Sequence, residues 1–404
     1  MKTRYLFIVI IICLAGFSQS CFAQAVSYLK PQAQLLAVIK QNLTDADSQY
    51  KLLADRLTPG RFPKNFNPAT NKLETGSSRW WCSGFYSGTL LNLYEQNHDE
   101  ALLTAAKHSM DSLAREQYNT HTHDLGFMMY TSFGNANRLS PNQEDKQILV
   151  NSAKSLSTRF NPKVGCIKSW ESKPSDFLVI IDNMMNLELL FWATKETGDS
   201  SFYKIAVTHA NTTMKNHYRS DFSSYHVINY NPETGAVQQK KTAQGFADES
   251  AWARGQVWGL YGFTVMYRET KDKKYLEQAK HIAEFILNNP NLPADKIPYW
   301  DFNAFNIPNV LRDASAGAIM ASALLELCRY TDNNDGIKYF SAAQSIIKTL
   351  SAPEYKAAPG TNGGFILKHS VGHFPQKSEL DVAISYADYY FVEAMKRYTQ
   401  FAAK

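Results

Sequence analysis

An aspartate inside a strongly apolar stretch is the most unusual residue of this sequence. Asp182 lies within FLVIIDNMMNL, residues 177–187. Burial of a lone ionised carboxylate is costly, so Asp182 must be paired, protonated or functional. Desolvation would raise its pKa, which is the usual preparation of a general acid. The alternative is a structural aspartate that is bonded to a backbone group or to an arginine.

A second candidate for chemistry is Asp124, which follows two histidines in the segment HTHDLG, residues 121–126. A carboxylate at the start of a predicted helix is also typical of an N-cap that accepts backbone N–H bonds. His121 and His123 beside a carboxylate raise the possibility of a metal site. No third and fourth ligands follow with a recognisable spacing, so the pattern argues against a metal centre.

Aromatic and cationic side chains come together in SAWARGQVW, residues 250–258. Trp252 and Arg254 would diverge by about 200° on a helix, but both could face the same way if this segment forms the helix entrance. Trp stacks on sugar rings, and Arg binds a carboxylate through paired N–H bonds. In the alternative interpretation, Trp252 and Trp258 belong to the core and Arg254 pairs with a buried Asp.

Apolar periodicity predicts helices along almost the whole chain, and these helices come in consecutive pairs. The first helix of each pair is rich in apolar and aromatic residues, whereas the second is amphipathic. The last apolar helix, 380–398, has no successor, so the N-terminal helix 32–53 is its expected partner. The other expected pairs are 84–94 with 100–115, 124–138 with 143–159, 177–196 with 202–218, 249–269 with 274–287, and 312–330 with 337–350.

Short polar turns join the helices of several pairs. ETGDSSF at 196–202 resembles ETKDKKY at 269–275, and YTDNND at 330–335 occupies an equivalent place. Connections of this length make neighbouring helices antiparallel. Six such hairpins, with apolar helices inside and amphipathic helices outside, predict an all-α fold, the (α/α)6 barrel. An open α-solenoid is the alternative, although common solenoid repeats are shorter and more regular.

One segment breaks the helical pattern. Residues 225–230 alternate in polarity, NPETG at 231–235 is a turn sequence, and 236–242 could return as a strand. This pattern predicts a short β-hairpin over one mouth of the barrel. Four long connections are also poor in helix signal, and loops of such length are often functional. They are 117–123, 161–176, 288–311 and 352–379.

The first residues are typical of a secretory signal peptide. A short basic start precedes an apolar run at 6–17, and small residues up to Ala25 offer a cleavage site. The run is too short to span a membrane, and no later segment is long and apolar enough to do so. We therefore expect a signal peptide at 1–25, a single catalytic domain at 26–404 and a periplasmic or otherwise exported protein. Lipid attachment at Cys21 is the alternative.

Composition excludes several other functions. The formal charge of the 404-residue chain falls from +5 to +3 once Lys2 and Arg4 are removed, which is too small to suggest binding of nucleic acid. Cys82, Cys166 and Cys328 lack the spacing of a disulfide framework or a zinc cluster. Aromatic residues make up 13% of the chain, enough to make stacking on sugar rings plausible.

Six motifs resemble those of glycoside hydrolase family 88, the unsaturated glucuronyl hydrolases. They follow in order over essentially the whole chain beyond the leader, and the four central motifs together are highly specific. The resemblance implies an (α/α)6 barrel that removes a 4,5-unsaturated uronic acid from the non-reducing end of lyase-generated, glycosaminoglycan-type oligosaccharides. The motifs are WWCSGF (80–85), HDLGF (123–127), IDNMMNL (181–187), SAWARGQVW (250–258), RDASA (312–316) and YADYYF (386–391).

The resemblance also implies roles for individual residues. Asp182 would protonate carbon 4 of the double bond and assist a water that adds at carbon 5, after which the hemiketal rearranges and the remaining sugar leaves. Asp124 would hold the uronate ring and support the proton transfer. No metal or organic cofactor is implied, and we expect a monomer or weak dimer. Substrate contacts are implied for His123, Trp170, His226, Gln244, Trp252, Arg254 and Trp258.

The chain departs from the family pattern near its C-terminus. Some members carry a Ser-x-x-Ser-x-Lys pattern there and accept sulfated fragments, whereas this chain has SVGHFP at 370–375. His373, Lys368 or Lys377 could still meet a sulfate group. Alternatively, the preferred substrate is unsulfated.

Three other functions compete with this interpretation. A rhamnogalacturonyl hydrolase shares the barrel and the hydration chemistry but prefers pectin fragments, and the segment 252–258 together with His226 favours the glucuronyl group. A sugar epimerase on the same barrel would rely on histidines. A carbohydrate-binding helical protein would turn nothing over. The fold alone does not separate these functions, because function belongs to the site.

Overall fold

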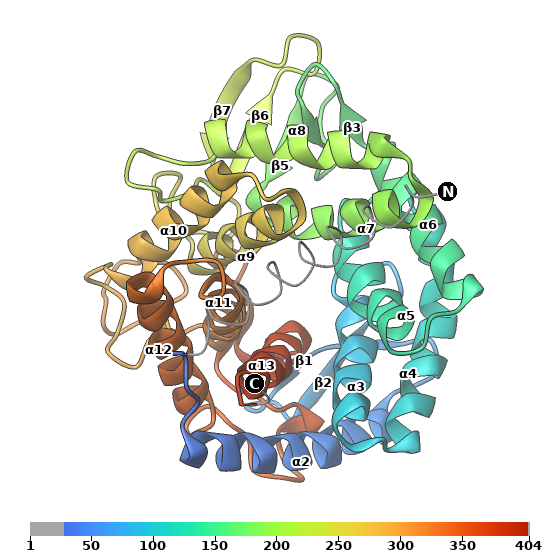
Figure 1. Ribbon diagram of the computed structural model, residues 1–404, viewed down its shortest axis with the longest axis vertical. Helices are drawn as coiled ribbons and strands as arrows, with labels where there is room; N and C mark the ends of the chain where they lie inside the picture. The colour runs from blue at the N-terminus through green and yellow to red at the C-terminus, as the bar shows by residue number, and fades with distance from the viewer. Residues whose placement is uncertain (1–27, 403–404) are drawn as a thin grey trace, which may run out of the picture.

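The helices form a closed double ring, an (α/α)6 barrel, in the computed structural model, which describes residues 28–402 (Figure 1). The predicted leader at 1–25 and Cys21 lie outside the described residues. Within 28–402, no helix has the length and apolar character needed to cross a membrane. The inner ring contains α3 (Ser83–Asn97), η2 (Gly126–Gly134) with α5 (Asn135–Leu139), α7 (Leu187–Thr197), α9 (Ala253–Thr270), α11 (Ala314–Leu327) and α13 (Ser385–Thr399). The outer ring contains α2 (Ala33–Arg56), α4 (Glu100–Leu113), α6 (Gln143–Ser157), α8 (Ser200–Asn216), α10 (Lys273–Leu287) and α12 (Asn333–Leu350).

The N-terminal helix α2 closes the outer ring, as the sequence predicts. It packs against α13 and α3, and α13 packs against α3 to close the inner ring. The backbone N–H of Gln32, just ahead of α2, donates a hydrogen bond of 2.9 Å to the hydroxyl of Tyr398 in α13. The two ends of the described chain are therefore joined, and the open solenoid is excluded.

The polar turns between paired helices act as helix caps. Asp199, Asp272 and Asp332 each accept a backbone N–H bond in the first turn of α8, α10 and α12 respectively. A cap of this kind contributes about 1 kcal/mol to stability. The inner helices depend less on capping, because burial in the core stabilises them; α11, for example, is buried along its whole length. Apolar inner helices and capped outer helices thus produce the antiparallel pairs.

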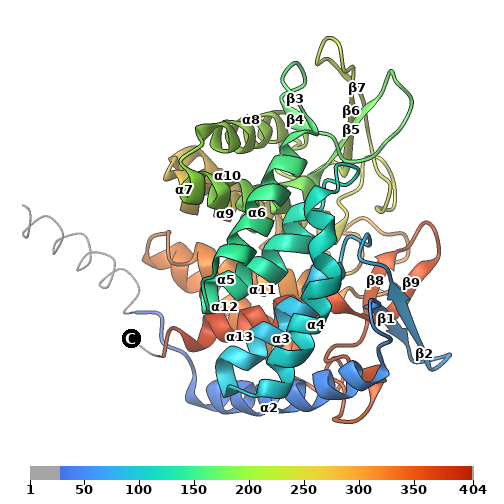
Figure 2. The same cartoon turned by 90° about the vertical axis from the view of Figure 1, so that its right-hand side faces the viewer.

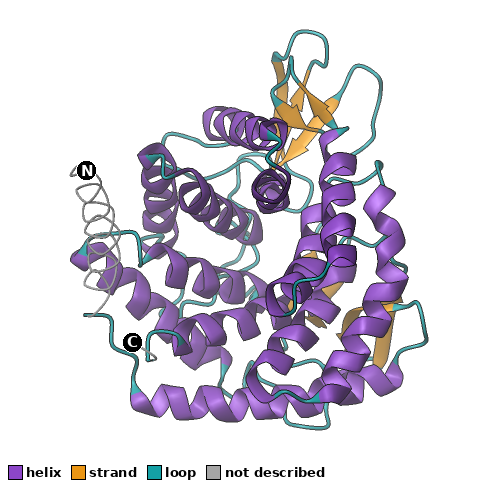
Figure 3. Ribbon diagram, turned by 45° about the vertical axis from the view of Figure 1, so that its right-hand side comes forward, coloured by secondary structure: helices purple, strands orange, loops and turns teal. Residues whose placement is uncertain are grey.

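Two small sheets lie at the same end of the barrel (Figure 2), and Figure 3 separates them from the helices. The predicted hairpin exists, as β6 (Val227–Tyr230) and β7 (Val237–Lys241), but β5 (Phe177–Ile180) extends it in the order β5-β6-β7. The second sheet was not predicted. Its order is β2-β1-β9-β8, from β1 (Phe62–Asn67), β2 (Lys72–Gly76), β8 (Ser370–His373) and β9 (Ser378–Ile384). A short pair, β3 (Phe160–Asn161) and β4 (Cys166–Ile167), lies nearby.

Two predicted helices begin as strands instead. The expected helix 177–196 starts with β5, continues as the 3-10 helix η3 (Ile181–Asn186) and becomes regular only in α7. The expected helix 380–398 starts within β9, and α13 begins at Ser385. A short apolar run fits a buried strand as well as a helix, and the pairing partner decides between them. Here β6 pairs with β5, and β1 and β8 pair with β9.

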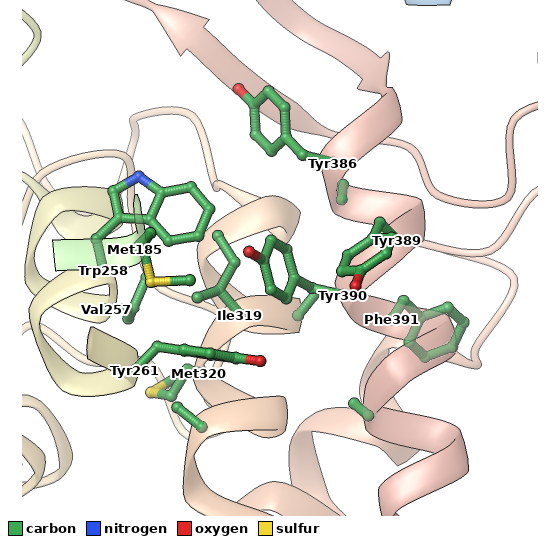
Figure 4. Close-up of a cluster of buried hydrophobic side chains, with 14 of the residues drawn as sticks. Met185, Val257, Trp258, Tyr261, Ile319, Met320, Tyr386, Tyr389, Tyr390 and Phe391 are labelled. Atoms are coloured by element: carbon green, nitrogen blue, oxygen red, sulfur yellow. The ribbon is translucent and has the colours of Figure 1, made fainter. Parts of the chain in front are cut away.

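Aromatic side chains fill the centre of the barrel. The ring centroid of Trp258 lies 5.0 Å from that of Phe127 and 5.4 Å from that of Tyr390. Figure 4 shows Trp258, Tyr261 and Tyr390 facing one another between α9 and α13. Such tilted and edge-to-face contacts add to the stability gained from burial alone. The core therefore separates the sheet-bearing mouth of the barrel from the opposite one.

Candidate active site

A cavity of about 290 Å³ at the sheet-bearing mouth brings together both candidate aspartates. A larger hollow of about 880 Å³ lies along α2 and α4 and contains neither of them. Six of the predicted site residues line the smaller cavity, namely His123, Asp124, Trp170, Asp182, Gln244 and Arg254. It is also lined by residues not predicted as site residues, among them Lys64, Trp80, Trp81, Gln376, Glu379 and Tyr386.

Asp182 stands in the first turn of η3, directly after β5. Its side chain is buried, and its Oδ2 atom has no hydrogen-bond partner among the described residues. Burial raises the pKa of Asp182 to about 7; the nearby Arg254 opposes this rise and Asp124 adds to it. The carboxyl is therefore partly protonated near neutral pH, as a general acid requires.

Asp124 immediately precedes the inner helix η2, but it is not an N-cap. Its carboxylate accepts a 3.2 Å hydrogen bond from Thr122 Oγ1, and no capping bond from the helix is formed. Burial raises the pKa of Asp124 to about 7, against the opposing effects of Thr122 and Arg159. The capping interpretation is wrong, and the site holds a second carboxyl that is partly protonated near neutral pH.

Asn186 joins η3, which carries Asp182, to the start of η2, which follows Asp124. Its Oδ1 accepts a 2.9 Å hydrogen bond from the backbone N–H of Phe127, at the start of η2. A side chain at Gly126 would place its Cβ only 2.4 Å from the Cα of Asn186, so this close approach requires glycine. Asn186 lies within the motif IDNMMNL, but nothing in the sequence alone indicated this role.

His226 lies behind Asp182 and does not line the cavity. Its Nε2 atom is 3.7 Å from Asp182 Oδ2, and its ring packs on Trp252 with centroids 4.6 Å apart. Trp170, whose centroid is 6.0 Å from that of His226, does line the cavity. Of these aromatic groups, Trp170 is the one placed to stack on a sugar ring.

The guanidinium group of Arg254 is already bonded to other groups of the protein. Its guanidinium pairs with Asp313 at 3.0 Å and donates to the carbonyl oxygens of Val371 and Gly372. It also lies over the ring of Trp252, 4.5 Å from the ring centroid. The buried ion pair, which was the alternative interpretation, is thus present. Arg254 still faces the cavity, but most of its paired donors already hold α11 and β8.

Trp252 and Trp258 belong to the core rather than to the cavity wall. Both are buried and neither lines the cavity. Trp252 immediately precedes α9, so this segment is indeed a helix entrance, yet its ring packs inward against Arg254 and His226. The inner helix α9 is buried from Ala253 to Met266, which leaves these rings little access to a ligand.

Only one of the three residues proposed for a sulfate reaches the cavity. His373 lines it, whereas Lys368 does not and donates to the Pro353 carbonyl oxygen at 2.7 Å. Lys377 is also absent from the lining. The lysine that does line the cavity is Lys64 in β1, which lies 4.0 Å from the centroid of the Trp80 ring. No helical periodicity surrounds Lys64, so the sequence carried no signal for it.

The cavity fits acid–base chemistry on a sugar. Two buried carboxyls are partly protonated near neutral pH, and Trp170 and Trp81 offer aromatic faces beside them. Between residues 28 and 402, no cluster of three His, Cys, Asp or Glu side chains could hold a metal ion. The three cysteines of this region are buried and unbridged.

The chain matches known proteins over most of its length. The model of Glycosyl Hydrolase Family 88 matches residues 55–269. An unsaturated glucuronyl hydrolase from Formosa agariphila is 44% identical over 86% of this chain and 87% of its own. An unsaturated chondroitin disaccharide hydrolase from Streptococcus pyogenes is 32% identical over 85% of this chain and 88% of its own.

Solved structures show the same relationship. An unsaturated glucuronyl hydrolase specific for heparin superposes with a TM-score of 0.88 and 49% identity, over 91% of this chain and 98% of that one. The unsaturated glucuronyl hydrolase of Bacillus sp. GL1 gives a TM-score of 0.84 and 29% identity, over 89% and 96% of the two chains. This chain is a glycoside hydrolase and belongs to glycoside hydrolase family 88.

Proposed function

We propose that this enzyme removes a 4,5-unsaturated uronic acid from the non-reducing end of lyase-generated glycosaminoglycan fragments by hydrating the double bond. Asp182 gives its proton to carbon 4, and a water then adds at carbon 5. The hemiketal so formed rearranges, the ring opens and the remaining sugar leaves. Asp124 holds the uronate ring beside Asp182.

The observation that carries this proposal is the state of Asp182. Its carboxyl is buried at the cavity wall, has no lysine or arginine partner among the described residues, and has a pKa of about 7. A displacement mechanism would need one carboxylate that stays ionised as nucleophile or base. Asp124 is poorly suited to that role, because burial raises its pKa to about 7 and so leaves it partly protonated near neutral pH. A partly protonated Asp182 suits protonation of a double bond.

The choice of glycosaminoglycan fragments rests on the relatives. They include chondroitin disaccharide hydrolases and a heparin-specific enzyme, and the latter shares 49% identity with this chain. Heparin-derived disaccharides are therefore the first substrates to try, ahead of chondroitin and pectin fragments. We also propose that the enzyme is exported through the leader at 1–25 and acts in the periplasm as a monomer or weak dimer.

The test is the absorbance at about 232 nm of the conjugated double bond, which acid–base hydration removes. Purified enzyme is mixed with unsaturated disaccharides from heparin, chondroitin, hyaluronan and pectin, with and without chelator. Chelator-insensitive loss of the signal on the first three supports the proposal. Preference for the pectin fragment would favour a rhamnogalacturonyl hydrolase. A constant signal on every substrate would overturn the proposal in favour of an epimerase or a binding protein.

A further inference from the structure

Two buried histidines lie beside the two aspartates, and their Nδ1 atoms play opposite roles in hydrogen bonding: one donates and the other accepts. His123 Nδ1 lies 2.9 Å from the carbonyl oxygen of Ser169. A carbonyl oxygen only accepts, so Nδ1 of His123 must carry a proton. His226 Nδ1 instead accepts the backbone N–H groups of Ala243 and Gln244, each at 3.1 Å. An N–H group only donates, so Nδ1 of His226 carries no proton.

Burial disfavours the doubly protonated form of both rings. Desolvation, with a smaller effect of Arg159, lowers the pKa of His123 to about 3. Desolvation and Arg254 lower the pKa of His226 well below its usual value. Each neutral ring then holds one proton, on Nδ1 in His123 and on Nε2 in His226. The Nε2 atoms differ accordingly: that of His123 is a bare acceptor, and that of His226 is a donor.

Each Nε2 atom points at one aspartate. His123 Nε2 is 3.2 Å from Asp124 Oδ1, and His226 Nε2 is 3.7 Å from Asp182 Oδ2. Neither nitrogen has another partner among the described residues. A bare nitrogen 3.2 Å from a carboxylate oxygen is repulsive unless a proton lies between them. That proton must come from Asp124, because Nδ1 already holds the only proton of the neutral ring.

We propose that His123 and His226 are held in opposite tautomers, so that His123 accepts the proton of Asp124 while His226 donates its Nε2–H toward Asp182. This inference deepens the proposed function and rests on it. Both histidines are positioning residues, because each acts through its aspartate. The distance from His226 to Asp182 is long for a hydrogen bond, but such contacts often shorten when substrate binds.

With opposite tautomers beside them, the two aspartates have different roles in proton transfer: Asp182 exchanges a proton with the substrate and Asp124 does not. Asp182 transfers its proton to carbon 4 and becomes a carboxylate, which the Nε2–H of His226 stabilises. The water that adds at carbon 5 returns a proton to Asp182, so the net change is the addition of one water. The pair of Asp124 and His123 shares a single proton, stays neutral and exchanges none with the substrate.

Arg159 holds the carbonyl group that fixes the tautomer of His123. Its guanidinium donates to the carbonyl oxygens of Thr120 at 2.7 Å, Lys168 at 2.8 Å and Ser169 at 3.2 Å. These carbonyls belong to the two loops that carry His123 and Trp170. The other charged or titratable groups that act on the four residues are Glu171, which pairs with Arg159, together with Arg254, His217 and His373.

The direct test is nitrogen NMR of the full enzyme with isotopically labelled histidines, in which protonated and bare ring nitrogens resonate far apart. The signals are assigned with the variants His123→Asn and His226→Gln. We expect His123 to show a bare Nε2 and His226 a bare Nδ1, with neither ring titrating between pH 5 and pH 8, roughly the range in which an unperturbed histidine titrates. The same tautomer at both positions, or a doubly protonated ring, would overturn the proposal.

The pH dependence of kcat/KM gives a second, functional test. Loss of a donor destabilises the Asp182 carboxylate, so His226→Leu should raise the pKa of Asp182 and move the basic limb of the profile to higher pH. We expect kcat to fall about tenfold, the usual effect of losing a hydrogen bond to a charged group. His226→Gln places an amide N–H near the position of Nε2 and should recover most of this loss. A basic limb that moves to lower pH, or does not move, contradicts donation by His226.

The two tests also separate this inference from the proposed function. The NMR signals report the tautomers whether or not the substrate is an unsaturated uronide. If the tautomers are as proposed and no substrate loses its absorbance, the proposed function fails alone. If hydration is observed with identical tautomers, only the present inference fails.

Discussion

The carboxyl groups at the two mouths of the barrel differ in their partners: those at one mouth pair with cations, and the two aspartates at the other do not. Inner helices α3 and α13 begin beside the active-site cavity and end at a second cavity of about 490 Å³. At that second mouth, four glutamates that are buried or half-buried each have a cationic partner. The ion pairs are Glu95 with Arg138 and Lys396, Glu188 with Arg268, Glu326 with Arg268 and Arg397, and Glu393 with Arg397.

The balance between burial and the cationic partner sets the pKa: at Glu188 burial still raises the pKa beside Arg268, whereas at Glu95 the partners win. Burial alone would raise the pKa of Glu95, but hydrogen bonds from Arg138 and Lys396 lower it to about 2. Asp182 is buried without such a partner, and its pKa rises to about 7. Paired charges at one mouth stabilise the fold, while neutral carboxyls at the other are available for chemistry.

Asp182→Asn should have the largest effect on rate. The amide keeps the shape of the carboxyl but has no proton to give at neutral pH, so kcat should fall by at least ~10²-fold. The melting temperature at neutral pH should be no lower than that of the wild type, because no ion pair is lost and the variant removes a carboxyl whose raised pKa costs stability as pH rises. Absorbance assays and thermal melts check both expectations. Near-normal turnover would remove Asp182 from the mechanism.

Glu326→Gln makes the matching change at the opposite mouth. Arg268 and Arg397 each lose a charged partner within 3.0 Å but keep another carboxylate, in Glu188 and Glu393, so the cost should be smaller than the about 3–5 kcal/mol of an uncompensated buried charge. Urea unfolding should show this loss, with kcat of the folded enzyme unchanged. A large fall in kcat without loss of stability would mean that the second mouth also takes part in catalysis.

Asp388→Asn tests whether a raised pKa by itself marks the active site. Burial raises the pKa of Asp388 to about 7, although it accepts hydrogen bonds from Tyr50 and from the N–H groups of Ile366 and Leu367. Its pKa in the folded protein exceeds the ordinary aspartate value of 3.8, so its stabilising effect is complete below pH 3.8 and is lost as pH rises to about 7.

The asparagine at position 388 does not titrate, so the variant should gain stability relative to the wild type between pH 4 and pH 7, roughly the interval between the two pKa values. Unfolding by urea at several pH values measures this gain. Turnover should not change, because Asp388 does not line the cavity. Loss of turnover in a folded variant would place Asp388 in the catalytic machinery.

Lys64→Gln should have the smallest effect. The ammonium group is at the rim of the cavity, about 4.0 Å from the Glu379 carboxylate, so its attraction for an anionic substrate is partly offset. We expect KM to rise no more than about fivefold with kcat unchanged, which is the size of effect of a weak surface ion pair. Lys72→Gln, in the exposed neighbouring strand β2, is the control. Equal effects of both variants would exclude a specific role for Lys64.

The sequence was informative where a residue type conflicts with its surroundings. Asp182 in an apolar run and the polar turns between paired helices were predictable, because local chemistry decides them. The β5 strand was not, since it depends on pairing with β6 about fifty residues later in the chain. The pairing of Arg254 with Asp313 and the contact of Asn186 with Phe127 depend on tertiary packing, which periodicity does not report.

Hydration through Asp182 is tested most directly by running the reaction in deuterium oxide and locating the label in the released uronic acid. Proton transfer from Asp182, whose carboxyl exchanges with solvent, predicts deuterium on carbon 4 and loss of the absorbance at about 232 nm. Asp182→Asn should show neither change. Cleavage of the glycosidic bond with the absorbance intact and carbon 4 unlabelled would contradict hydration and indicate ordinary hydrolysis at the anomeric carbon.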